Sequence, residues 1–105
     1  NIGVSSAQIQ FKQTQQRIEA QLQQAFQAYT TNLVLVSLET QNKQTAKQNM
    51  DISLEKFRLG SLSAIEFREA QLNYVNASAR TIDAQFQAKQ AEIALKQLSG
   101  ELSVN

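Results

Sequence analysis

The sequence predicts an all-α protein, a long antiparallel coiled-coil hairpin whose two helices cover about residues 5–59 and 63–99. Proline is absent, and the three glycines lie near the beginning, the middle and the end, so nothing interrupts a helix between them. Gln, the most frequent residue, and Ala both favour helix. Apolar residues recur about every 3.5 residues, which is the repeat of a left-handed coiled coil.

The first expected helix, residues 5–59, carries a seam at alternating steps of four and three residues. The seam comprises Leu22, Phe26, Tyr29, Leu33, Val36, Thr40, Lys43, Lys47, Met50, Leu54 and Phe57. Its middle is polar, because Thr40, Lys43 and Lys47 occupy seam positions. A hairpin whose only partner was its own second helix would favour apolar residues there, so the seam indicates neighbours outside the pair. Glu39–Lys43 and Glu92–Lys96 are also spaced as i,i+4 ion pairs.

The connection at residues 59–63 carries the strongest local signals. Gly60 suits the left-handed conformation that ends a helix. Ser63 and Glu66 form a predicted capping box, in which the hydroxyl and the carboxylate each accept a hydrogen bond from a free amide. Leu62 and Phe67 have the spacing of a hydrophobic staple. So short a connection makes the two helices antiparallel neighbours.

The second expected helix, residues 63–99, carries two stripes. We expect the apolar one to be the seam against the first helix; it comprises Ile65, Arg68, Leu72, Val75, Ala79, Ile82, Phe86, Lys89 and Ile93. Small residues repeat every seven positions on the other, which comprises Ala70, Ala77, Ala84 and Ala91, with Leu98 next. Small side chains let a further helix approach closely, so this stripe predicts contact on a second face.

The second helix is shorter than the first and covers it only back to about Leu22. The helical residues before that, including Phe11 and Ile18, therefore need a partner outside the hairpin. We expect the isolated hairpin to self-associate, because its lateral faces lack their neighbours.

Composition excludes several chemistries. Without Cys or His there is no zinc site, disulfide, cysteine nucleophile or Ser-His-Asp triad. A net charge of +1 argues against nucleic-acid binding through phosphates. No apolar run is long enough to cross a membrane, and no secretion signal opens the chain. We expect no enzymatic activity, no metal and no cofactor.

The run FRLGSLSAIEFREAQ, residues 57–71, resembles the hairpin-tip pattern of the TolC-like outer-membrane efflux factors. That pattern has an aromatic residue, Arg-Leu-Gly, then Ser or Thr, an acidic residue and Ala-Gln. Residues 17–29 resemble the family's descending helix, and residues 94–100 resemble the close of the same repeat. The likeness covers nearly the whole chain, which lacks the barrel strands, second repeat and signal peptide of the family.

The resemblance implies that residues 1–105 are one periplasmic hairpin of a Gram-negative outer-membrane protein, with its tip at 59–63. Family members are trimers that form an α-helical barrel, an exit duct for drugs or secreted proteins. Their tips meet the hairpins of a periplasmic adaptor in multidrug efflux or type I secretion. Carried over to this chain, the partner-binding residues are Arg58, Leu59, Gly60, Ser61 and Ser63.

Two other functions stay open. One is the coiled-coil hairpin of the adaptor itself, which also carries Arg-Leu and Ser near its tip but not Arg-Leu-Gly directly before the Ser. The other is a structural coiled-coil spacer in the cytoplasm. The gene sequence on either side of this segment would discriminate among the channel, the adaptor and the spacer.

Overall fold

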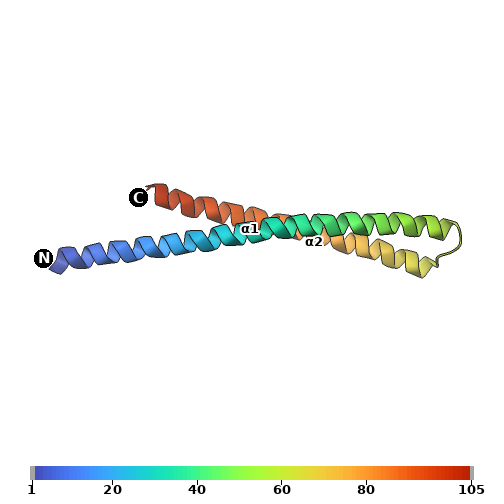
Figure 1. Ribbon diagram of the computed structural model, residues 1–105, viewed down its shortest axis with the longest axis horizontal. Helices are drawn as coiled ribbons and strands as arrows, with labels where there is room; N and C mark the ends of the chain where they lie inside the picture. Colours follow the sequence, from blue (N-terminus) through green and yellow to red (C-terminus); the bar gives the residue numbers. More distant parts are fainter. Residues whose placement is uncertain (1, 105) are drawn as a thin grey trace. The chain divides into compact units, whose positions relative to one another are not determined.

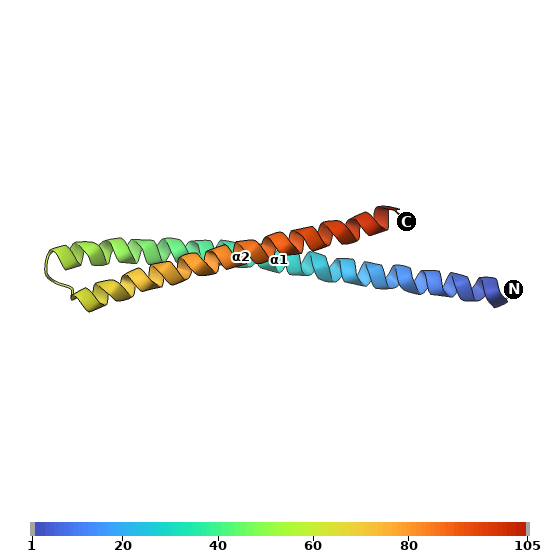
Figure 2. The ribbon, with the colours of Figure 1, turned by 180° about the vertical axis from the view of Figure 1, so that it is seen from behind.

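The computed structural model describes residues 2–104, and the side chains of residues 2–100. These residues form two helices and no strand: α1, Ile2–Arg58, and α2, Ala64–Val104. The chain reverses at the turn between them, so α1 and α2 run antiparallel (Figures 1 and 2). The predicted all-α helical hairpin is confirmed. Asn1 and Asn105, which the predicted hairpin of residues 1–105 includes, lie outside the described residues.

Both helices extend beyond the predicted bounds at the ends away from the turn. α1 begins at Ile2 and α2 continues through Ser99 and Gly100 to Val104. Among the described residues only Gly60 has a positive φ, so Gly100 does not take the left-handed conformation that would end a helix. A single helical glycine costs only about 1 kcal/mol relative to alanine, which is too little to stop a long helix.

The chain divides into two compact units, each containing part of both helices. The tip unit is residues 32–88, which include the turn and the adjoining parts of α1 and α2. The end unit joins α1 up to Thr31 with α2 from Lys89 onward. The turn and the residues expected to bind a partner all belong to the tip unit.

The face of α2 that packs on α1 in the tip unit, here called the seam face, contains the alanines of the small-residue stripe. It comprises Phe67, Ala70, Tyr74, Ala77, Thr81, Ala84 and Ala88. Ala77 is only 1% exposed, and Thr81, Ala84 and Ala88 are also buried. The prediction that the apolar stripe would be the seam is wrong, because its members Ile65, Leu72, Val75, Ile82 and Phe86 are exposed. We call these five residues the outer face of α2.

On α1, about half of the predicted seam positions face α2. Burial of Leu22, Tyr29, Val36, Lys43 and Met50 follows the expected register, since all five are partly buried. The alternating positions are mostly shifted by one residue toward the N-terminus: Ala25, Asn32, Glu39, Ala46 and Ser53 are partly buried, whereas Phe26, Leu33, Thr40 and Lys47 are exposed. Leu54 is partly buried, as predicted, and Phe57, the last predicted seam residue, is exposed. α1 is therefore rotated relative to the prediction, so that Ala25 and Asn32 face the seam in place of Phe26 and Leu33.

A polar contact joins the two helices within the tip unit. Arg80 Nε donates to Glu39 Oε2 at 2.9 Å, and the Thr81 hydroxyl lies 3.0 Å from the Glu39 carbonyl oxygen. The Thr81 hydroxyl also lies 2.9 Å from the Ala77 carbonyl oxygen of its own helix. Glu39 was expected to pair with Lys43 and pairs with Arg80 instead, because the helix rotation turns its carboxylate toward α2.

The first part of α1 lacks cover, as the length of the helices predicts. Every described side chain from Ile2 to Arg17 is exposed, and Phe11 is 65% exposed. Ile18, expected to be uncovered as well, is partly buried. α2 runs past its predicted end, so it reaches further along α1 than expected.

Candidate functional site

The end of α1 forms a Schellman motif around Gly60, whose φ is 82°. The Gly60 amide donates to the Phe57 carbonyl at 3.1 Å, and the Ser61 amide donates to the Lys56 carbonyl at 2.9 Å. These two bonds satisfy carbonyls that a helix end leaves without intrahelical partners. The left-handed residue predicted at position 60 therefore ends the helix as the sequence indicates.

The start of α2 is capped by Ser63. Its carbonyl accepts from the Phe67 amide at 3.0 Å, and its hydroxyl oxygen accepts from the Glu66 amide at 3.2 Å. The second half of the predicted capping box differs. The Glu66 carboxylate accepts from the Ser63 hydroxyl at 3.3 Å, in place of a backbone amide. One hydroxyl thus both accepts from and donates to the same glutamate, which holds the first turn of α2.

A ring stack across the turn was missed by the sequence reasoning. Phe57 and Phe67 lie with ring centroids 5.4 Å apart and planes inclined by 14°. Stacked aromatic pairs add about 0.5–1.5 kcal/mol beyond their buried area. The available signal was two phenylalanines flanking the turn, one on each helix. The predicted staple of Leu62 on Phe67 stays a prediction, although both side chains are partly buried.

The five residues expected to bind a partner lie together on the outside of the turn, and all are exposed. The Leu59 side chain is 80% exposed, and a Cβ built on Gly60 would meet nothing within 4 Å. Arg58 forms a loose, exposed ion pair with Glu55 at 3.6 Å, which contributes little in water. The Ser61 hydroxyl donates to the Lys56 carbonyl at 3.1 Å.

This arrangement suits binding to another protein. An exposed leucine offers apolar area, and the open space over Gly60 lets a partner approach the backbone closely. Arg58 is free to exchange its exposed partner for a carboxylate of another chain, since a surface pair is easily replaced. The hydrogen bonds and the ring stack hold the backbone beneath these side chains, so little ordering remains to be done on binding.

A second exposed surface runs along the sides of the tip unit. On α2 it is the outer face, and on α1 it includes Leu33, Val34, Leu38 and Ile52. The outer-face side chains recur at helical spacing, and the hairpin alone leaves them uncovered. The sequence predicts contact on two faces of α2, and the structure exchanges the roles of the two stripes.

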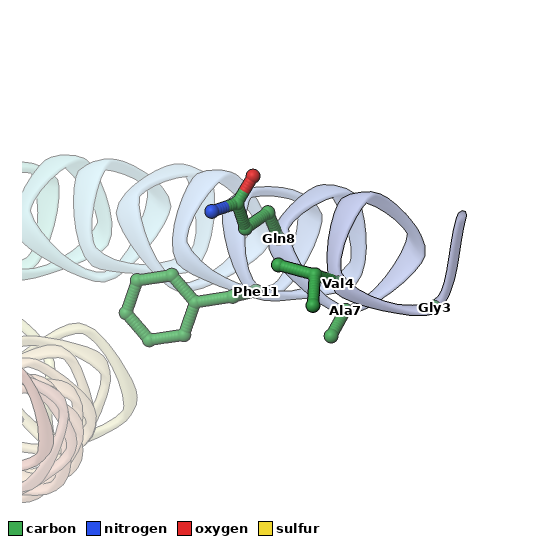
Figure 3. A pocket seen from close by; sticks show the side chains of 5 residues that line it. All are labelled: Gly3, Val4, Ala7, Gln8 and Phe11. Atoms are coloured by element: carbon green, nitrogen blue, oxygen red, sulfur yellow. The ribbon is translucent and has the colours of Figure 1, made fainter. Parts of the chain in front are cut away.

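Grooves occur in the end unit. One, with a volume of about 460 Å³, lies between the two helices and is lined by Leu22, Gln23, Phe26, Leu95 and Ser99. Another, of about 430 Å³, follows the uncovered part of α1, where Val4, Ala7 and Phe11 lie along the helix with Gln8 beside them (Figure 3). Both are open and largely apolar, as expected where a helix lacks a neighbour.

Two ion pairs that share Glu92 lie on α2 of the end unit. Glu92 accepts from Lys96 at 2.9 Å, the predicted pair, and lies 3.6 Å from Lys89. The hydrogen bond from Lys96, with the charges of both lysines, holds the pKa of Glu92 below its ordinary value. The same bond and the Glu92 charge raise the pKa of Lys96. The two lysines are exposed, Glu92 is partly buried, and all three lie away from the turn.

In the part of the chain that the structure describes, neither helix carries a stretch apolar enough to cross a bilayer. The same residues contain no cluster of three or more acidic, His or Cys side chains placed to hold a metal ion. Comparison with protein-family models, with curated proteins and with solved structures finds no match to this chain.

Proposed function

We propose that this chain is part of the α-helical barrel of an outer-membrane channel in a tripartite efflux or type I secretion system. Its turn would dock on the hairpins of a periplasmic adaptor, and the intact parent would be a homotrimer. The observation that carries the proposal is the orientation of α2. It packs on α1 through small residues and leaves its large apolar side chains exposed on the outer face.

The physical argument starts from this orientation. Burial of a fully exposed side chain of this kind contributes about 1.5–3 kcal/mol. Ile65, Leu72, Val75, Ile82 and Phe86 are still 54–74% exposed, so the hairpin alone leaves more than half of that gain unused. A helix flanked on both sides, as in the wall of a helical barrel, buries both faces. The uncovered N-terminal part of α1 supports the same proposal, because it also requires helices from outside the hairpin.

The tip supports an adaptor as the partner. In the resembling family the hairpin tips contact adaptor hairpins, and the corresponding residues here are Arg58, Leu59, Gly60, Ser61 and Ser63. All five are exposed on a turn that backbone hydrogen bonds hold. A protein partner that presents apolar residues and a carboxylate would complement the leucine and the arginine.

Site-specific photocross-linking in the source cells tests whether the tip docks on an adaptor. A photoreactive residue replaces Ser61 in one variant and Gln44, an exposed residue of α1 away from the turn, in the control. We expect a covalent adduct with a periplasmic adaptor from position 61 and not from position 44. The Gly60→Val change should weaken the adduct. Equal adduct from both positions, or unchanged adduct in Gly60→Val, would count against docking by the tip.

Sequencing the gene on both sides of this segment tests whether the parent protein is an outer-membrane channel. We expect a signal peptide, alternating strands and a second Arg-Leu-Gly-x-x-Ser hairpin. Flanking lipoyl-like halves would identify an adaptor hairpin instead. A stand-alone reading frame would favour a structural spacer.

A further inference from the structure

Helix α2 has two faces that compete for α1. The seam face and the outer face both follow a heptad repeat, and both contain large side chains, such as Phe67 and Tyr74 on one and Ile82 and Phe86 on the other. Their positions differ by two and five residues, which places them about 150° apart around the helix. A half-rotation of α2 would therefore exchange one apolar face for the other.

The polar contact between the helices exists for only one of these orientations. Arg80 and Thr81 reach the side chain and the backbone of Glu39 respectively. The Glu39 side chain is only 13% exposed, whereas that of Arg80 is 56% exposed. In the rotated orientation Glu39 would face the outer-face side chains, and a carboxylate against apolar groups without a partner is strongly disfavoured.

The contact also lies where other constraints are weak. Close to the turn, the stack of Phe57 on Phe67 holds the rotation of α2. Further along, the seam consists mainly of alanine, and alanine side chains make few orienting contacts. Thr81 is the one buried polar residue among those described, at 4% exposure, and it donates toward α1 from the middle of this stretch.

We propose that Arg80, Thr81 and Glu39 act as positioning residues that select which face of α2 packs on α1. By holding the alanines inward, they keep the outer face open to a neighbouring helix. The inference rests on the proposed function only for the identity of that neighbour. The selection itself is a property of this chain and is measured without any membrane or adaptor.

The test measures the reactivity of single thiols with a water-soluble maleimide, at low protein concentration so that chains stay apart. The chain has no native cysteine, and Val75 and Ala77 are two residues apart with exposures of 57% and 1%. In the otherwise unchanged chain, the Val75→Cys thiol should react at least about tenfold faster than the Ala77→Cys thiol, because burial requires opening before reaction.

The contact is then removed with Glu39→Gln, Arg80→Gln and Thr81→Val together, in each cysteine variant, so that no carboxylate remains to oppose the outer face. The expected result is reversal of the reactivity order, with the Ala77→Cys thiol now the faster one. Arg80→Lys with Thr81→Ser keeps the charge and the hydroxyl and should restore the original order. As a matched control, Lys89→Gln with Lys96→Gln removes two lysines from a carboxylate on the same helix and should leave the order unchanged.

Two results would overturn the proposal. If the original order persists without the Glu39 carboxylate, Arg80 and Thr81, the remaining packing selects the face. If both thiols react equally fast and helical circular dichroism falls, the contact stabilises the hairpin as a whole and selects no face. Either result leaves the cross-linking and gene-sequence tests of the proposed function unaffected.

Discussion

Gly60 controls the turn through its backbone conformation alone. Its φ of 82° lies in the left-handed region, while the space around its missing Cβ is open. A side chain at this position would therefore be disfavoured by backbone strain and not by collision. The two can be separated experimentally because Gly100 lies inside α2, also with nothing within 4 Å of a built Cβ, but without a positive φ.

Matched alanine substitutions should give opposite effects at the two glycines. Gly60→Ala should lower the free energy of unfolding by about 1–2 kcal/mol, the penalty of a left-handed L-residue. Gly100→Ala should raise it by about 0.5–1 kcal/mol, because alanine favours the helix interior. Urea unfolding followed by circular dichroism measures both. Loss of stability at both positions would contradict the assignment of Gly100 to helix interior.

The hydroxyl of Ser63 is expected to matter more than that of Ser61. Ser63→Ala removes the acceptor for the Glu66 amide and should lower stability by about 1 kcal/mol, a usual value for a helix cap. Ser61→Ala removes only a second donor to the Lys56 carbonyl, which still accepts from the Ser61 amide. Thermal unfolding of the two variants compares them, and an equal loss would argue against the cap.

At the scale of the helix, the pKa shifts on α2 predict a pH dependence. The lowered pKa of Glu92 means that its contribution to stability is complete above the ordinary carboxyl pKa and is lost as pH falls through the lowered value. The raised pKa of Lys96 gives the opposite sign: its contribution is lost as pH rises through the raised value. Carboxyl NMR should find the Glu92 midpoint below the ordinary value of a glutamate carboxyl. Lys89→Gln with Lys96→Gln should move the Glu92 midpoint upward, and an unmoved midpoint would contradict the assigned cause.

The helices and the turn could be predicted from sequence because their causes are local. Gly60 and Ser63 act on residues within a few positions of themselves, and the absence of proline leaves the helices uninterrupted. The seam could not be assigned in the same way. Two heptad stripes on α2 satisfy the same pattern, and hydrophobicity alone favours the one that the structure exposes.

What decides between the stripes involves residues far apart in the chain. Glu39 and Thr81 are 42 positions apart, and no local pattern shows that they meet. The ring stack at the tip was missed for a related reason. Phe57 fits the predicted seam of α1, and only the geometry of the turn brings it onto Phe67.

For the whole chain we predict self-association through the outer face. Val75→Gln with Ile82→Gln should weaken association about tenfold or more for each residue, since burial of one such side chain contributes about 1.5 kcal/mol or more. Leu59→Gln, at the tip, where the leucine is even more exposed, is the control and should leave association unchanged. Sedimentation equilibrium measures the dissociation constants. A strictly monomeric chain at high concentration would contradict the prediction.

The two apolar faces of α2 have a geometrical consequence for any such assembly. The seam face is covered by α1 of the same hairpin, so a neighbouring copy can bind only the outer face of α2, and it would meet that face with a different surface, such as the exposed apolar side chains of its own α1. Contacts of this heterologous kind close into a ring when successive rotations complete a circle, and otherwise grow into an open filament. The angle between adjacent hairpins then decides whether isolated copies form rings or fibres. A change in the volume of one side chain at the interface can alter that angle.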